Sequence, residues 1–143
     1  MLIKSISGIR GTIGGKPGKS LTPIDIVRFA ASYGKWIKEK QRGNKIVLGR
    51  DGRISGPIVS QLAINTLLAM GIDVIDAGLS TTPTIEMAVR WENADGSMIL
   101  TASHNPKEWN ALKLLNNKGE FISAEDGKYI VEEAIKEDFD FSS

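Results

Sequence analysis

The chain has 143 residues, of which 41% are hydrophobic and 24% charged, and its formal net charge is +1. These values are typical of one globular domain that is large enough to bury a core. The sequence contains no basic block, no apolar run of membrane-spanning length and no signal-peptide pattern. We therefore expect a cytoplasmic protein whose partners are neither nucleic acid nor a membrane.

The first half of the chain alternates between expected strands and helices. A strand is expected within residues 3–9, and a hairpin or loop should follow it in a glycine-rich segment. Thr22 and Pro23 have the residue types of an N-cap and a first helical position, so a helix should run from there to about residue 40. Residues 45–49 then form an apolar run typical of a buried strand.

The middle of the chain repeats this alternation. Ser55 is expected to cap a second helix, which Gly71 ends. A strand over residues 73–77 follows, and Thr82 with Pro83 should open a short helix that ends near residue 91. Another strand is expected over residues 97–101.

The last third predicts a strand, a tight turn and a helix. The strand covers residues 111–115, and residues 116–119 have the composition of a turn. Ser123 is expected to cap the final helix, whose predicted inward residues are Ile130, Val131, Ala134 and Ile135, with Glu132 and Glu133 on its solvent face.

Strands that alternate with helices predict an α/β protein with a largely parallel sheet. The short spacing between residues 97 and 121 leaves room for a hairpin. We therefore expect a three-layer α/β/α sandwich with a mostly parallel mixed sheet of about four strands, one of them antiparallel.

The segment with the clearest chemical potential is residues 101–106, Thr-Ala-Ser-His-Asn-Pro, which we call the serine loop. Asn105 can close a turn, and the proline after it restricts the backbone, so the loop should present Ser103 at the carboxyl end of a strand, where ligands bind in open α/β sheets. Most loop serines only bond to nearby backbone. The other interpretation is a nucleophile or phosphate carrier, although the adjacent His104 is poorly placed to act as its base.

Two further segments are candidates for binding. Glycines on both sides of Arg10, in the segment Ser7-Gly8-Ile9-Arg10-Gly11, allow close backbone approach to a phosphate, although an ordinary solvated arginine has the same pattern. The segment 49–56 joins a strand to a helix and is a natural anion site, yet Asp51 could equally pair with Arg50 or Arg53 and hold the loop.

Lys113 lies inside the expected strand 111–115. A lysine there usually marks the solvated side of a strand, but in a pocket it could transfer protons. One near match is rejected: residues 13–20 resemble a P-loop, but Ile13 stands where the first glycine must be.

Taken together, these segments resemble the first domain of the α-D-phosphohexomutases, the family of phosphoglucomutase/phosphomannomutase and phosphoglucosamine mutase. The serine loop matches the family's phosphoserine loop. Residues 7–11 match its N-terminal arginine motif, residues 49–56 its second-strand motif, and residues 109–113 the segment after the serine. The order and spacing of all four segments agree with those of the family's motifs.

The resemblance implies an isomerase mechanism. Ser103 would carry a phosphate, pass it to a hexose monophosphate and take one back from the resulting hexose 1,6-bisphosphate. Mg²⁺ would bind one oxygen of the phosphoserine. Arg10 would steady the transferring group, and Lys113 and His104 would be candidates for proton transfer. The resemblance gives binding or loop-supporting roles to Ser7, Gly8, Arg50, Arg53 and Asn105.

Family members have four domains, and we expect residues 1–143 to be domain I alone. The aspartate-rich metal loop, the sugar loop and the C-terminal phosphate-binding domain would belong to domains II–IV, the expected partners of this chain. The isolated domain is therefore expected to be inactive. Two other classes remain as alternatives: a noncatalytic phosphosugar-binding or regulatory module of the same fold and, less favoured, a serine hydrolase.

Overall fold

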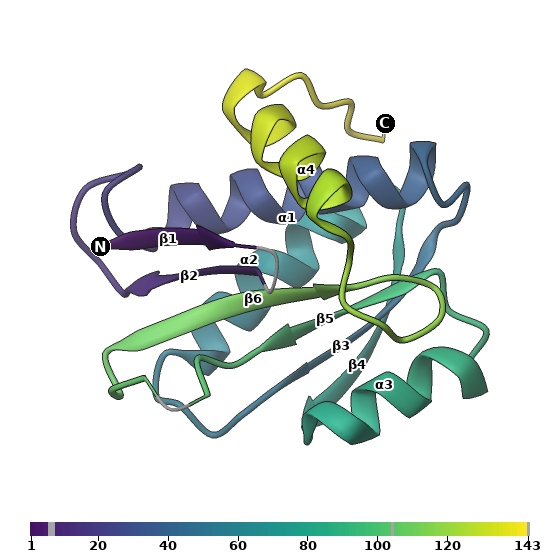
Figure 1. Ribbon diagram of the computed structural model, residues 1–143, viewed down its shortest axis with the longest axis horizontal. Coiled ribbons are helices and arrows are strands. Elements are labelled where there is room, and N and C mark those ends of the chain that lie inside the picture. Colours follow the sequence, from purple (N-terminus) through teal and green to yellow (C-terminus); the bar gives the residue numbers. More distant parts are fainter. Residues whose placement is uncertain (6–7, 104, 143) are drawn as a thin grey trace.

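The computed structural model describes residues 1–5, 8–103 and 105–142. These ranges contain six strands and four helices, which alternate from α1 to β5 (Figure 1). Their bounds are β1 Leu2–Ser5, β2 Gly8–Thr12, α1 Pro23–Glu39, β3 Lys45–Arg50, α2 Gly56–Ala69, β4 Asp73–Leu79, α3 Thr82–Trp91, β5 Gly96–Leu100, β6 Trp109–Leu115 and α4 Ala124–Lys136.

The six strands form a single mixed sheet in the order β1-β2-β6-β5-β3-β4. The pairs β3–β4 and β3–β5 are parallel, whereas β5–β6, β2–β6 and β1–β2 are antiparallel. The parallel strands β3 and β5 therefore end at the same edge of the sheet. The antiparallel strand β6 begins there, after the serine loop.

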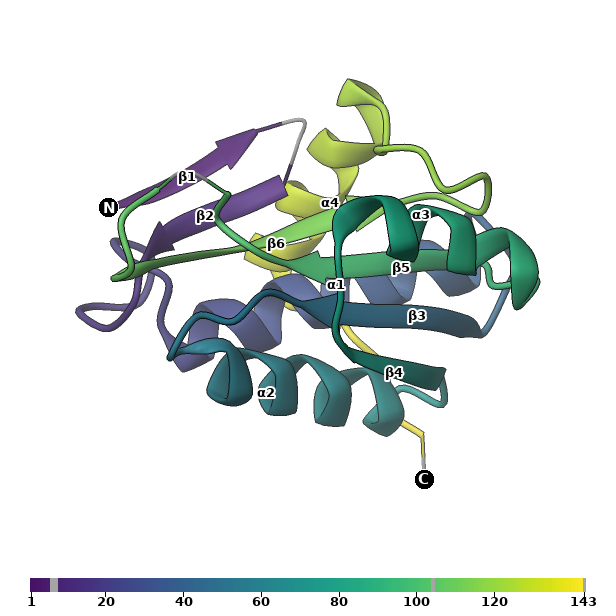
Figure 2. The same cartoon turned by 90° about the horizontal axis from the view of Figure 1, so that it is seen from below.

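Helices cover both faces of the sheet, which gives the three expected layers (Figures 1 and 2). Successive side chains on a strand point to opposite faces. On β3, Ile46 and Leu48 therefore enter the larger core under α1, α2 and α4, whereas Val47 enters a smaller core under α3. The smaller core is completed by Ile85 and Val89 of α3 and by strand residues on that face.

The α/β/α class is confirmed, but the sheet is larger than expected. Strands β4, β3, β5 and β6 correspond to the predicted strands after residue 44, with β6 antiparallel. The N-terminal segment, where one strand was expected within residues 3–9, contributes two, because β1 and β2 pair with each other and β2 pairs with β6 through Ile9↔Leu112 and Arg10↔Ala111. Three of the five strand pairings are consequently antiparallel, so the prediction of a mostly parallel sheet holds only for the strands after residue 44.

Two of the three serine or threonine caps named from the sequence form as expected. The Thr22 side chain accepts from the backbone N–H of Asp25, and Ser123 caps α4 in the same way through Asp126. Ser55 precedes α2, but its hydroxyl makes no capping hydrogen bond. It accepts instead from the Asn110 amide at 2.8 Å, which ties the start of α2 to the start of β6.

The orientation of α4 differs from the prediction by part of a turn. Ile130 and Ala134 are buried as expected, but Ile135 is 68% exposed. Glu133, expected on the solvent face, is buried and pairs with Lys35 of α1 at 2.9 Å. The helix thus rests on α1 through a polar contact as well as an apolar one. No helix within the described ranges is long and apolar enough to cross a membrane.

Candidate active site

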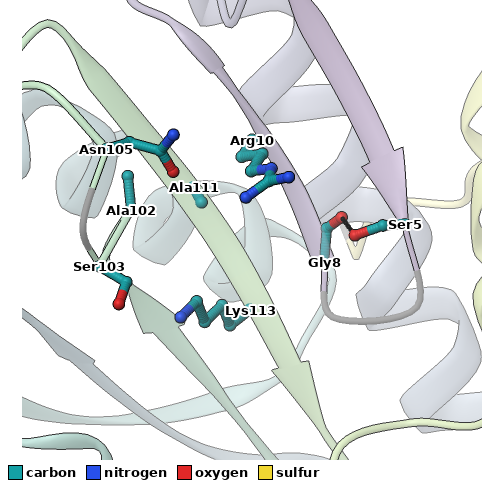
Figure 3. Close-up of a pocket in the computed structure, with 8 residues that line it drawn as sticks. All are labelled: Ser5, Gly8, Arg10, Ala102, Ser103, Asn105, Ala111 and Lys113. Carbon is teal, nitrogen blue, oxygen red and sulfur yellow. Dashed lines mark hydrogen bonds between the residues drawn. The ribbon is translucent and has the colours of Figure 1, made fainter.

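A cavity of about 300 Å³ lies beside the serine loop, over the part of the sheet where the N-terminal hairpin meets β6 (Figure 3). It combines an exposed hydroxyl, two cationic side chains and small residues that leave room for a ligand. The lining residues are Ser5, Gly8, Arg10, Ala102, Ser103, Asn105, Ala111 and Lys113.

Strand register brings Arg10 and Lys113 to the same face of the sheet. Their neighbours Ile9 and Leu112 are buried in the larger core, so alternation directs both cations to the face that carries α3. Figure 3 shows the Lys113 amine directed toward Ser103, with Arg10 projecting from the adjacent strand. Lys113 therefore faces the pocket, the less common of the two alternatives left open by the sequence.

The approach of β2 to β6 requires glycine at the head of β2. Gly8 has a φ of +130°, and a Cβ atom there would lie 2.2 Å from the Leu112 carbonyl oxygen. This is far inside van der Waals contact, so a side chain would push the hairpin away from β6. Gly8 thereby keeps Arg10 close to Lys113. The Ser5 hydroxyl also donates to the Gly8 carbonyl at 3.3 Å.

Ser103 is exposed at the pocket and has a φ of +52°, in the left-handed region. A residue other than glycine pays about 1–2 kcal/mol for this conformation. Such a conformation persists only where surrounding contacts impose it. The Asn105 N–H donates to the Ala102 carbonyl at 3.0 Å, which closes a tight turn around the serine.

Arg53 uses its whole guanidinium to hold the serine loop. Nε donates to the Asp51 carboxylate at 3.1 Å, and the two terminal nitrogens donate to four backbone carbonyls between 2.7 and 3.1 Å. A guanidinium has five N–H donors, so all are in use. The four carbonyls belong to Ser103, Asn105, Pro106 and Trp109.

Arg50 lies apart from the pocket. Its terminal nitrogen donates to the Asp51 carbonyl at 3.3 Å, and its side chain packs over Gly56 at the start of α2. Of the two arginines in this segment, Arg53 is the one that makes hydrogen bonds to the described residues of the serine loop. Two other candidates, Ser7 and His104, lie outside the described residues.

The two pocket cations contrast with Arg53. Neither Arg10 nor Lys113 makes a side-chain hydrogen bond or an ion pair with the residues at 1–5, 8–103 and 105–142. An unpaired guanidinium and an unpaired ammonium beside an exposed hydroxyl create a local positive field in an almost neutral protein. Planar N–H donors and a point charge both suit phosphate oxygens. The pocket can therefore bind an anion of phosphate size next to Ser103.

Metal ligands are not clustered here. Within the described residues, no group of three or more histidine or acidic side chains is placed to hold a metal ion. The acidic residue closest to the serine loop in the hydrogen-bond network, Asp51, is already bonded to Arg53 and Thr101. These protein side chains do not form a Mg²⁺ site by themselves.

Two residues of the site were not singled out from the sequence. Thr101 connects Asp51 to the Ser103 backbone, and the fully buried Asn110 fixes the start of β6. A sequence signal was available for Thr101, because Asp51 and Thr101 follow two parallel strands and such ends share one edge.

The fold and the pocket define a class: an α/β domain that presents a loop serine, at the carboxyl edge of its sheet, to two cations without a partner among the described residues. Comparison with known proteins identifies the family. Residues 2–141 match the family model described as phosphoglucomutase/phosphomannomutase, alpha/beta/alpha domain I. The chain therefore belongs to the phosphoglucomutase/phosphomannomutase family and corresponds to its domain I.

Individual relatives agree with this assignment. A phosphoglucomutase/phosphomannomutase of Thermococcus kodakarensis is 38% identical over 132 residues, which cover 90% of this chain and 29% of that protein. A phosphoglucosamine mutase of Helicobacter pylori is 34% identical, with 92% and 29% covered. The chain thus spans less than a third of the length of these relatives.

A solved structure shows the same fold. A phosphoglucomutase/phosphomannomutase family protein from Burkholderia thailandensis superimposes with a TM-score of 0.82 at 27% sequence identity. The match covers 100% of this chain and 32% of that one.

Proposed function

We propose that this chain is the phosphoserine-bearing domain of a hexose phosphate mutase. The observation that carries the proposal is the position of Ser103: exposed, held in a left-handed conformation, and facing the unpaired cations Arg10 and Lys113. Family membership supports the same assignment. A pocket that only bound phosphosugars would not need a strained, exposed hydroxyl beside its cations.

In the proposed reaction, Ser103 carries a phosphoryl group and a hydroxyl of a hexose monophosphate attacks the phosphorus. The new oxygen–phosphorus bond forms as the Ser103 Oγ–P bond breaks. The sugar hydroxyl gives up its proton to a basic group, and the departing Ser103 oxygen gains a proton. The product is a hexose 1,6-bisphosphate, which reorients in the site and returns its other phosphate to Ser103 by the reverse step.

Each pocket residue has a part in this scheme. Arg10 binds oxygens of the transferring group and stabilises the charge that spreads over them. Lys113 is directed toward Ser103 and is the proposed proton-transfer group, with His104 as the second candidate. Asn105 lines the same pocket and completes the wall on the loop side.

Mg²⁺ is proposed as the cofactor of the complete enzyme. When bound, it would neutralise charge on the phosphoryl group through one phosphoserine oxygen. The remaining ligands would come from outside the described side chains, which form no acidic cluster. Because the relatives are about three times longer, we also propose that further domains supply the rest of the sugar site.

A labelling experiment tests this function. The complete polypeptide and the 143-residue chain are incubated with glucose 1,6-bisphosphate, and peptide mass spectrometry locates any added phosphate. We expect one phosphate, on Ser103, and none in Ser103→Ala. A label on another residue, or no label even in the complete polypeptide, would contradict the proposal and favour a binding module.

A further inference from the structure

A line of hydrogen bonds joins the end of β3 to the backbone of the catalytic serine. The Thr101 hydroxyl lies 2.6 Å from the Asp51 carboxylate, and the Ser103 N–H lies 3.1 Å from the same hydroxyl oxygen. We propose that Asp51 and Thr101 are positioning residues, which orient Ser103 for phosphoryl transfer without touching the substrate. The inference deepens the proposed function and rests on it.

The chemistry of the partners fixes the direction of each bond. A carboxylate can only accept, so the Thr101 hydroxyl must donate its hydrogen to Asp51. Its lone pairs are then available to the Ser103 N–H. A free hydroxyl would rotate and could donate elsewhere, so Asp51 determines that Thr101 is an acceptor for the serine.

Asp51 is itself held in place from two sides. Its carboxylate accepts from the Arg53 Nε at 3.1 Å and from the Arg53 backbone N–H at 3.2 Å. Its own backbone N–H donates to the Leu100 carbonyl at 3.1 Å, which locks the end of β3 to the end of β5. The carboxylate therefore anchors Ser103 to the rigid sheet as well as to its own loop.

Two consequences follow for Ser103. Its N–H is held by Thr101 and its carbonyl by Arg53, and together these bonds fix the left-handed conformation of Ser103 at the pocket. Its N–H is also occupied, so it cannot stabilise charge on the phosphoryl group. That task falls to Arg10 and Lys113, the pocket cations without a partner among the described residues.

The test replaces the hydroxyl of Thr101 while keeping its shape. In Thr101→Val we expect the Ser103 amide hydrogen to exchange about five- to tenfold faster, the change that corresponds to losing a typical hydrogen bond. Thr101→Ser should restore the slow exchange. Thr66→Val is the matched control, because the Thr66 hydroxyl donates to the Leu62 carbonyl within α2, away from the serine loop.

The second readout is the rate at which glucose 1,6-bisphosphate labels Ser103 in the complete polypeptide. Thr101→Val should lower the maximal labelling rate at least tenfold with little change in the bisphosphate concentration for half-maximal rate. Thr101→Ser should recover most of it, and Thr66→Val should match the unsubstituted protein. Asp51→Asn, which keeps the side-chain size, should change both readouts in the direction of Thr101→Val.

The outcomes separate the two proposals. Unchanged amide exchange in Thr101→Val, or labelling as fast as in the unsubstituted protein, overturns the positioning role and leaves the proposed function intact. No label in any form, the unsubstituted polypeptide included, overturns the proposed function and the positioning role with it. The amide spectrum away from the serine loop reports whether each variant keeps its fold.

Discussion

Three arginines close to one site have three different environments. Arg53 has every N–H donor occupied by the protein, Arg50 packs at the start of α2, and Arg10 faces the pocket without a bonding partner in the described ranges. A charge whose donors are all satisfied holds structure, whereas one that is left unpaired is available to a ligand. Hydrogen bonding thus separates Arg53 from Arg50, to which the family resemblance gives the same role.

The clamp formed by Arg53 predicts a stability difference. Arg53→Lys keeps the charge but cannot reach four carbonyls and a carboxylate from one nitrogen. We expect the free energy of unfolding to fall by about 1–3 kcal/mol, as for loss of hydrogen bonds to a charged group. Urea denaturation of the variant and the parent measures this difference in the free energy of unfolding. Arg90→Lys is the control, since Arg90 donates from an exposed position on α3 to a single carbonyl, and equal effects of both changes would refute the clamp.

Much of the site could be predicted from local sequence, but the hydrogen bonds that join its distant residues could not. The glycines around Arg10 and the Ser-His-Asn-Pro segment have recognisable patterns within a few residues. The bond between Asp51 and Thr101 joins residues fifty positions apart, and the sequence left Asp51 free to pair with either neighbouring arginine. Only the parallel pairing of β3 with β5 decides which contacts form.

At the scale of elements, α4 shows where periodicity reaches its limit. Apolar residues at 130, 131, 134 and 135 fit two adjacent stripes, and apolar spacing alone cannot choose between them. The choice is made by Lys35 on α1, which draws Glu133 inward through a pair at 2.9 Å. Ile135 is thereby rotated outward. The start of the helix was predictable because Ser123 and Asp126 carry a capping signal.

The same ion pair predicts a pH effect. The hydrogen bond from Lys35 lowers the pKa of Glu133 below its ordinary value of 4.5, despite some opposition from burial. A folded-state pKa below the unfolded one adds stability that is complete above pH 4.5 and is lost as the pH falls through the folded pKa. Glu133→Gln should therefore be less stable than the parent at neutral pH.

The difference from the parent should shrink on acidification. Thermal unfolding from pH 7 down to pH 3 measures this effect. Glu132→Gln is the matched control, because Glu132 is exposed and its pair with Lys128 is long, at 3.9 Å. A constant difference between Glu133→Gln and the parent across this range would contradict the assignment.

Two buried serines should respond differently to substitution by alanine. The Ser32 hydroxyl on α1 donates to the Ile130 carbonyl of α4, whereas the Ser97 hydroxyl on β5 is buried without a hydrogen-bond partner among the described residues. Ser32→Ala should lower the free energy of unfolding by about 1 kcal/mol, and Ser97→Ala should leave it unchanged or raise it. Chemical denaturation compares them, and a larger loss for Ser97→Ala would contradict this packing.

At the scale of the whole molecule, the described residues form a packed core on each face of the sheet and one candidate pocket. The two cores are closed by helices on both faces, yet the pocket has no acidic cluster for a metal within the described residues. Relatives that the chain matches are more than three times its length. This difference in length is the basis for the proposal that further domains supply the remaining sugar and metal contacts.

This division predicts that the 143-residue chain alone does not turn over substrate. We expect no measurable interconversion of glucose 1-phosphate and glucose 6-phosphate, because proximity and charge stabilisation from the other domains would be missing. A coupled assay for glucose 6-phosphate, with the complete polypeptide as positive control, measures it. A normal enzymatic rate from the isolated chain would refute the proposed division of labour.

The proposed transfer of a phosphate from Ser103 to a hexose phosphate can be followed in a chase experiment. The complete polypeptide is labelled at Ser103, freed of bisphosphate, and mixed with glucose 6-phosphate. We expect the label to leave Ser103 and to appear in glucose 1,6-bisphosphate in equal amount. Label that stays on Ser103, or leaves only as inorganic phosphate, would contradict it.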